Sequence, residues 1–261
     1  MPTYRLLLEY DGTKFCGWQI LPKGRTVQGV LVETLREVTG EEDLNVHGAG
    51  RTDAGVHALG QVASFRTRKP LNVAKALREL EDHLPADVAV RDLRLAAPDF
   101  HARHHATGRA YRYQLALRRS AFGKRYTWWV GGEVDLAAME RAARSFLGRH
   151  DFAAFTKRTK EQKSTVVHVE DAQMRARGTV VLVRIVASHF LWNQVRRMVG
   201  VLVEVGRGHL EPEDVSELLS GRKPLPPVAA PASGLFLEAV RYPGEPFLLP
   251  PLEPVGVPPW G

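Results

Sequence analysis

Short apolar strands alternate with single amphipathic helices along both halves of the chain. In the first half, YRLLLEY at residues 4–10 predicts a strand that ends at the turn Asp11-Gly12, and LNVHGAG (44–50) and GQVASF (60–65) predict further strand segments. A sheet whose strands are separated by single helices buries its apolar face under those helices. We therefore predict an α+β protein built in layers.

The two helices predicted in the first half have clear start and stop signals. Thr26 and Asn72 are residue types that accept a hydrogen bond from a backbone N–H at a helix N-terminus. The first helix would stop at Gly40, and Pro85 would end the second. The apolar face of the first helix consists of Val27, Val30, Leu31, Leu35 and Val38.

The second half repeats this alternation. The pattern predicts a strand at 111–117, a helix at 135–148, strands at 166–176 and 179–187, and a helix from about 190 to 206. A divergent duplication would explain the repetition, although no repeat is visible in the sequence itself.

Length and composition predict the division into domains. A chain of 261 residues forms one large domain or two modest ones. We expect an N-terminal α+β half at 1–104 and a C-terminal α+β half at 105–242. Residues 222–233 are rich in proline and alanine, and 243–261 form a proline-rich tail, so both are expected to be extended connections.

Several classes of protein are disfavoured by composition. No apolar run approaches the roughly 20 residues that a membrane helix needs. The opening MPTYRLLLEYDG is too short and too acidic for a signal peptide. Cys16 is the only cysteine, which excludes an internal disulfide and a cysteine-based metal site. We expect a cytoplasmic protein.

The charge distribution predicts a nucleic-acid partner. The net charge is +7, and no Asp or Glu occurs between Phe100 and Gly132. That stretch interleaves basic with aromatic side chains, namely Arg103, Arg109, Arg112, Arg118, Arg119, Lys124 and Arg125 with Tyr111, Tyr113, Phe122, Tyr126, Trp128 and Trp129. Basic groups neutralise phosphates and aromatic faces stack on bases, which suits an RNA surface. A second basic run is FTKRTKEQK at 155–163. A solvated face over core aromatics remains the alternative for both.

The stretch GAGRTDAGVHALGQ at 48–61 contains one carboxylate, Asp53, between Arg51 and His57. An aspartate before a small residue is common in turns, where its side chain bonds nearby backbone amides. The neighbouring arginine instead favours a permanently ionised carboxylate, which a nucleophile or general base requires. Both interpretations are open at this point.

Other chemistries have weaker support. The chain has neither a G-x-S-x-G nucleophile elbow nor a G-x-x-x-x-G-K-[ST] phosphate loop. His47, Asp53 and His57 are close in sequence, but arginines flank them and the two histidines do not have the H-x-x-x-H spacing of a helical metal site. A metal-dependent nuclease or phosphoesterase and an RNA-binding module without catalysis remain as alternatives.

The stretch GRTDAGVHALGQVASF at 50–65 resembles the signature of the TruA-type tRNA pseudouridine synthases. Further blocks resemble that family in the same order, and together they cover nearly the whole chain. They are YDGTKFCGWQ (10–19) with TVQ (26–28), FHARHHATGRAYRYQL (100–115), GRHDFAAF (148–155), FLWNQVRRMVGVLVEVG (190–206) and APASGLFLEAVRY (230–242).

The resemblance implies a fold and a set of site residues. The family fold has two similar α/β-sandwich-like halves with mainly antiparallel sheets around a central, positively charged catalytic cleft. Asp53 matches the catalytic nucleophile, Tyr111 the active-site tyrosine, and Arg196 the basic residue that pairs with the aspartate. Arg51 matches the arginine that handles the flipped nucleotide, and Leu235 an apolar pocket residue.

The resemblance also implies the reaction. The family isomerises uridine to pseudouridine at positions 38, 39 and 40 in the anticodon arm of tRNA, as a homodimer and without cofactor or metal. Two residues depart from its pattern, because Gln194 stands where methionine is expected and Phe236 where tyrosine is expected. Both departures leave the charged groups of the implied site intact.

Overall fold

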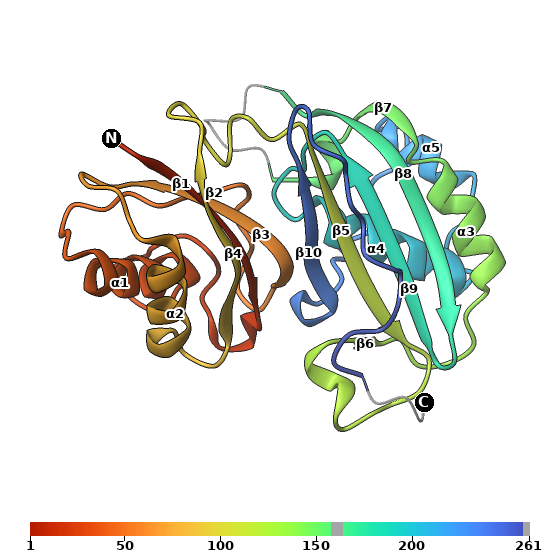
Figure 1. Ribbon diagram of the computed structural model, residues 1–261. Coiled ribbons are helices and arrows are strands. Elements are labelled where there is room, and N and C mark those ends of the chain that lie inside the picture. The colour runs from red at the N-terminus through yellow and green to blue at the C-terminus, as the bar shows by residue number, and fades with distance from the viewer. Residues whose placement is uncertain (158–163, 258–261) are drawn as a thin grey trace. The chain divides into compact units, whose positions relative to one another are not determined.

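The computed structural model describes residues 1–157 and 164–257, which divide into two compact units (Figure 1). Unit 1 comprises Met1–Thr107 and Phe236–Leu248, and unit 2 comprises Gly108–Leu235 together with the segment from Leu249 onward. The predicted division at 104 and 242 stays a prediction.

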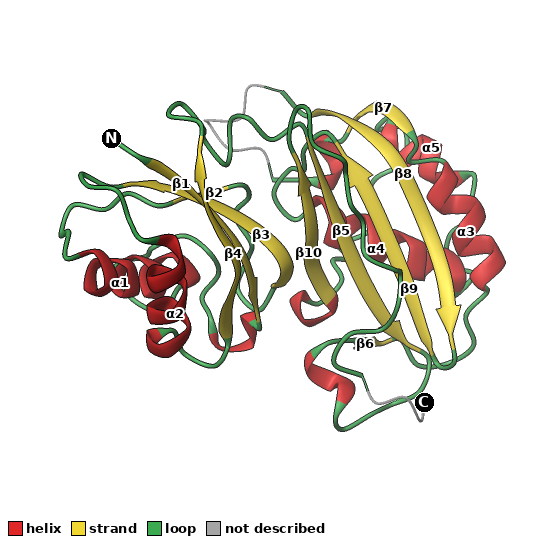
Figure 2. Ribbon diagram, in the orientation of Figure 1, coloured by secondary structure: helices red, strands yellow, loops and turns green. Residues whose placement is uncertain are grey.

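Unit 1 is a mainly antiparallel sheet with two helices. Its strands are β1 (Thr3–Tyr10), β2 (His47–Gly48), β3 (His57–Arg66), β4 (Val88–Ala96) and β10 (Leu235–Arg241). The first residue of β10, Leu235, belongs to unit 2, and the rest of the strand belongs to unit 1. The order is β4-β1-β3-β10, with β2 paired to β3. Strand β1 runs antiparallel to β3 and β4, whereas β10 runs parallel to β3 and places Phe236 opposite His57. The helices α1 (Val27–Thr39) and α2 (Val73–His83) lie on one side of this sheet (Figure 2).

Both predicted helix starts in unit 1 are confirmed. The Thr26 hydroxyl accepts a hydrogen bond from Gly29 N, and the Asn72 side chain accepts one from Lys75 N. Helix α1 ends at Gly40, whose φ of 68° is the left-handed conformation that glycine adopts without strain. Strand β4 was not among the predicted strands, although Val88, Val90 and Leu93 are buried along it.

Unit 2 is an antiparallel sheet in the order β5-β9-β8-β7. Its strands are β5 (Gly108–Ala116), β6 (Trp128–Trp129), β7 (Gly148–Asp151), β8 (Val166–Arg177) and β9 (Val180–Ala187). The short strand β6 pairs with β5 in parallel, whereas the pairs β5–β9, β9–β8 and β8–β7 are antiparallel. The helices are α3 (Leu136–Arg144), α4 (Gln194–Gly206) and α5 (Asp214–Leu219), and α3 packs on α4. The predicted α+β class with mainly antiparallel sheets is confirmed. Within the described ranges, no helix is both long and apolar enough to cross a membrane.

In the proline-rich tail, residues 249–257 form neither helix nor strand and pack onto the unit 2 sheet. Arg112 on β5 is only 2% exposed, and its Nη1 and Nη2 donate to the carbonyls of Glu253 and Pro251. Arg184 on β9 donates to Pro250 O in the same way. Buried guanidinium groups need acceptors, and the carbonyls of the tail supply them. The expectation that Arg112 faces RNA was therefore wrong.

Leu252 anchors this tail by its side chain. It is 5% exposed and forms a small cluster with Val180 and Leu182 of β9. We expect Leu252→Ala to lower the free energy of unfolding by about 2 kcal/mol, because the substitution removes apolar contacts with the sheet and leaves a cavity in their place. Urea denaturation followed by circular dichroism measures this value. Leu248→Ala is the control, since Leu248 is 77% exposed; equal effects of the two substitutions would contradict the account.

Candidate active site

Asp53 lies in the loop that connects β2 to β3 in unit 1, and its side chain is half-buried. Its carbonyl accepts a hydrogen bond from Val56 N at 3.1 Å, which closes a four-residue turn. Gly55, the third residue of that turn, has a φ of 77° that favours glycine. The turn interpretation is thus correct for the backbone of Asp53, and it leaves the function of the carboxylate open.

A neighbouring segment of unit 1 fixes this loop. Trp18 N donates to Thr52 O at 3.0 Å, and Gly55 N donates to Phe15 O at 3.3 Å. Two glycines of the segment allow the close approach. A Cβ on Gly12 would lie 1.9 Å from Val56 O, and a Cβ on Gly17 would lie 2.7 Å from Thr52 O. Backbone contacts on both sides of Asp53 therefore fix the position of the loop.

A buried hydrogen-bond network ties the same loop to the sheet. The Tyr10 hydroxyl lies 2.8 Å from Thr52 Oγ1, next to Asp53 in the chain. Gln61 Nε2 donates to Gly50 O at 2.9 Å and to the Tyr10 hydroxyl at 3.4 Å. Burial raises the pKa of Tyr10 to about 12, so the hydroxyl stays protonated at neutral pH. The loop is thus attached to β1 and β3 by neutral hydrogen bonds.

Gly17→Ala tests whether this bracing matters. We expect it to lower the free energy of unfolding by about 2 kcal/mol, since Gly17 has a φ of +102° and the new Cβ meets Thr52 O. Displacement of the loop should also lower kcat by about tenfold. The control is Gly40→Ala, with a φ of +68° but no atom within 4 Å of the added Cβ. Chemical denaturation and turnover assays give both values, and equal turnover of the two variants would contradict the bracing.

The two histidines near Asp53 are engaged in packing. His57 is 1% exposed, its Nδ1 lies 3.0 Å from Gly12 N and 3.1 Å from Asp11 Oδ1, and its ring stacks on Phe236. The His47 ring stacks on His101 at 4.6 Å between centroids. Among residues 1–157 and 164–257, no group of three or more His, Cys, Asp or Glu side chains is placed to hold a metal ion.

In unit 2, Tyr111 lies on β5 and is 9% exposed. Its ring meets Phe190 edge to face, with centroids 5.0 Å apart. Tyr113, two residues along the same strand face, is fully buried and donates to Pro231 O at 2.7 Å. Burial raises the pKa of Tyr113 well above its usual value. Tyr113 is therefore a structural side chain, whereas Tyr111 is slightly more exposed.

Arg196 lies in the first turn of α4 and is half-buried. Its Nε donates to Ala230 O at 2.7 Å, and its Nη1 donates to Asn193 Oδ1 at 2.9 Å. Ala230 N returns a hydrogen bond to Arg196 O at 2.8 Å. These contacts hold the guanidinium in one orientation. They also attach it to Ala230, in the segment that precedes the buried Leu235.

The two departures from the family pattern are accommodated locally. Gln194 is fully buried, and its Oε1 accepts a hydrogen bond from Leu191 N at 2.9 Å. Phe236 stacks on His57 with centroids 4.7 Å apart. Within the described residues, neither Gln194 nor Phe236 has a buried side-chain polar atom that lacks a hydrogen-bond partner.

The candidate residues are thus distributed over both units. Arg51, which is exposed, and Asp53 lie in unit 1, while Tyr111, Arg196 and Leu235 lie in unit 2. Reasoning from the sequence missed the supporting roles of Tyr10, Gly12, Gly17, Thr52 and Gln61. The blocks YDGTKFCGWQ and GRTDAGVHALGQVASF contain these residues, but only the contacts in the structure reveal what they do.

The basic and aromatic stretch between 100 and 132 is divided between interior and surface. Arg112 and Tyr113 are buried. The exposed members between β5 and β6 are Arg118, Arg119, Phe122, Lys124, Arg125 and, at the end of β6, Trp129. In the second basic run, 158–163 lie outside the described residues, so its RNA contact stays a prediction.

Comparison with known proteins identifies the family. The sequence matches the family model described as tRNA pseudouridine synthase over residues 7–104 and 142–243. It is 48% identical over 256 residues to tRNA pseudouridine synthase A of Solidesulfovibrio magneticus, covering 93% of this chain and 92% of that protein. The chain belongs to the tRNA pseudouridine synthase family. Other relatives are the proteins of the same name from Syntrophotalea carbinolica (45% identical, 93% of this chain and 97% of that protein) and Maridesulfovibrio salexigens (42%, 93% and 91%).

Family membership makes the chain an enzyme, an isomerase acting on uridine in tRNA. Asp53 and Arg196 lie inside the two matched ranges, and Tyr111 lies between them. The match therefore spans the loop that carries the carboxylate and the helix that carries the guanidinium.

Proposed function

We propose that this pseudouridine synthase modifies positions 38, 39 and 40 in the anticodon arm of tRNA, with Asp53 acting as nucleophile or base on a flipped-out uridine. The observation that carries the proposal is the Asp53 loop. It presents a half-buried carboxylate on a backbone that Tyr10, Trp18 and Phe15 hold in place. A preorganised charge is what an enzyme needs at a reacting sugar and base.

The isomerisation requires no redox partner. The bond from N1 to the sugar C1′ breaks, the base turns, C5 bonds to C1′, and the proton lost from C5 is matched by one gained at N1. An ionised carboxylate and a wall that holds the detached base are sufficient in principle. Asp53 is proposed for the first role, and Tyr111 together with Leu235 for the second.

Cationic groups complete the proposal. Arg196 is proposed to pair with the carboxylate and orient it, and Arg51 to contact the flipped nucleotide. Extruding a base from a stem costs a few kcal/mol, which contacts to the RNA backbone must offset. Arg118, Arg119, Lys124 and Arg125 are exposed, and we propose that they supply such contacts. From the family resemblance we also propose a cytoplasmic homodimer.

A mapping experiment tests the function against its alternatives. An unmodified tRNA transcript is incubated with the protein in EDTA, and pseudouridine is located by carbodiimide adducts that stop primer extension. New stops at positions 38 to 40 are expected. Binding without stops would indicate an RNA-binding module, and cleavage that appears only when divalent cations are restored would indicate a nuclease.

A further inference from the structure

The residue just before α4 has an unusual backbone conformation. Asn193 has a φ of 59° and a ψ of 5°, and among the residues that the structure describes it is the only one other than glycine with a positive φ. This left-handed conformation crowds the Cβ of most L-residues, whereas glycine adopts it freely and asparagine is more tolerant than most. Such strain persists only where the surrounding contacts maintain it, and it is concentrated at functional sites. The reason for an asparagine at this position therefore lies in its contacts.

A tight turn sets the backbone of Asn193. Gln194 N donates to Leu191 O at 3.1 Å, and Leu191 N donates to Oε1 of the buried Gln194 side chain at 2.9 Å. Asn193 is the third residue of this turn, where turns of types II and I′ require a positive φ. None of these bonds uses the side chain of Asn193, so glycine at this position would retain the turn without strain.

The side chain of Asn193 contributes instead to the orientation of Arg196. Its Oδ1 accepts a hydrogen bond from Arg196 Nη1 at 2.9 Å, while Ala230 O accepts one from Arg196 Nε at 2.7 Å. Acceptors on two nitrogens of a planar group define the plane of that group. Aspartate would also tolerate the turn, but its charge would compete with Asp53 for the guanidinium. Asparagine thus combines tolerance of the left-handed backbone with a neutral acceptor for Arg196.

We propose that Asn193 is a positioning residue for the isomerisation: its left-handed backbone and its amide oxygen hold the Arg196 guanidinium in the orientation in which it pairs with Asp53. The inference rests on the role proposed for Arg196, and it adds a residue that acts on the reaction only through Arg196. Some stability of the turn is given up here for a fixed orientation of the guanidinium.

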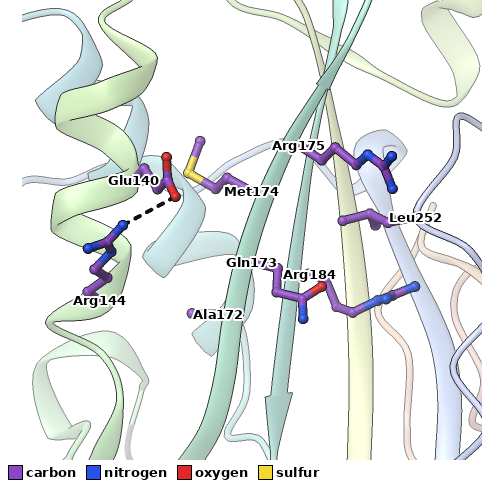
Figure 3. A pocket seen from close by; sticks show the side chains of 8 residues that line it. All are labelled: Glu140, Arg144, Ala172, Gln173, Met174, Arg175, Arg184 and Leu252. Atoms are coloured by element: carbon purple, nitrogen blue, oxygen red, sulfur yellow. Dashed lines mark hydrogen bonds and ion pairs between the residues drawn. The ribbon is translucent and has the colours of Figure 1, made fainter.

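A pocket elsewhere in unit 2 is separate from this turn. It has a volume of about 330 Å³ and lies along β8 (Figure 3), where Glu140 and Arg144 of α3 form an ion pair at 3.4 Å. Its lining side chains in the described part of the chain come from α3, β8, β9 and the tail, and none belongs to 190–197 or to 228–235. The contacts of Arg196 with Asn193 and Ala230 therefore hold its side chain independently of that pocket.

Asn193→Gly removes the amide and relieves the backbone, so stability and rate should respond differently. The melting temperature should stay within about 2 °C of wild type, whereas the single-turnover rate of pseudouridine formation should fall by about tenfold, since the guanidinium is held less precisely. The dissociation constant for tRNA should change by less than about twofold. Asn193→Ala lacks the amide and also strains the turn, so it should lower both the rate and the melting temperature. Asn45→Gly, at an exposed loop residue, is the matched control and should behave as wild type.

The double variant of Asn193→Gly with Arg196→Ala tests whether Asn193 acts through Arg196. Its rate should equal that of Arg196→Ala alone, because the amide then has no guanidinium to orient. Three results would overturn the inference alone: a further loss of rate in the double variant, a wild-type rate of Asn193→Gly beside a slow Arg196→Ala, or an equal loss of rate and tRNA affinity in Asn193→Gly. A wild-type rate of Arg196→Ala would refute the proposed role of Arg196, and the inference would fall with it.

Discussion

Asp53→Asn is expected to lower kcat for pseudouridine formation by at least about 10⁴-fold, while the dissociation constant for tRNA changes little. The amide has nearly the shape of the carboxylate, and the turn is closed by the backbone carbonyl of residue 53, which the substitution keeps. What disappears is the negative charge. Single-turnover assays on an unmodified transcript, together with filter-binding measurements of affinity, separate the two effects.

The control for Asp53→Asn is Asp43→Asn in the same unit. The Asp43 side chain is 91% exposed and lies 3.8 Å from Arg68, so its charge is solvated. Turnover by this variant should match wild type. Substantial turnover by Asp53→Asn would mean that the carboxylate only shapes the turn.

Arg196→Ala is expected to lower kcat by about 10³-fold with a much smaller effect on tRNA affinity, because the carboxylate with which Arg196 is proposed to pair would lose the partner that orients it. The guanidinium is suited to this role, since Ala230 O and Asn193 Oδ1 fix two of its nitrogens. Arg196→Lys should recover only part of the rate, because lysine cannot bond both acceptors in the same planar geometry.

A loss of stability has to be separated from this loss of rate. Arg207→Ala is the matched control for stability. Arg207 directly follows the C-terminal end of α4 and donates to Val130 O at 2.6 Å. Both substitutions remove a guanidinium bonded to a backbone carbonyl, so both should lower the melting temperature. Only Arg196→Ala should affect kcat strongly. Equal losses of affinity and rate in Arg196→Ala would instead make it a phosphate contact.

Local signals in the sequence predicted local structure well. The hydroxyl of Thr26 and the amide of Asn72 cap their helices through contacts three residues away, so a short window of sequence contains both partners. The end of α3 was less predictable. The helix was expected to reach 148, but it stops at Arg144, because Gly148 begins β7 and pairs with Val169 of β8. That pairing depends on a strand formed later in the chain.

Long-range contacts explain the rest. Arg112 has the sequence context of an RNA-facing residue, yet the chain returns about 140 positions later and the carbonyls of Pro251 and Glu253 surround its side chain. The contacts of Tyr10 and Gly17 with Thr52, next to Asp53, likewise join segments 42 and 35 positions apart. The site residues themselves were predicted from the family resemblance, and their roles stay predictions.

The most direct test is a structure of Asp53→Asn bound to an unmodified tRNA, in which substrate can accumulate without turnover. The account predicts that a uridine at position 38, 39 or 40 has left the helical stack and that the side chain of residue 53 lies within hydrogen-bond or van der Waals distance of its sugar C1′ or its uracil. An anticodon arm with all bases stacked, or an everted base far from residue 53, would contradict it.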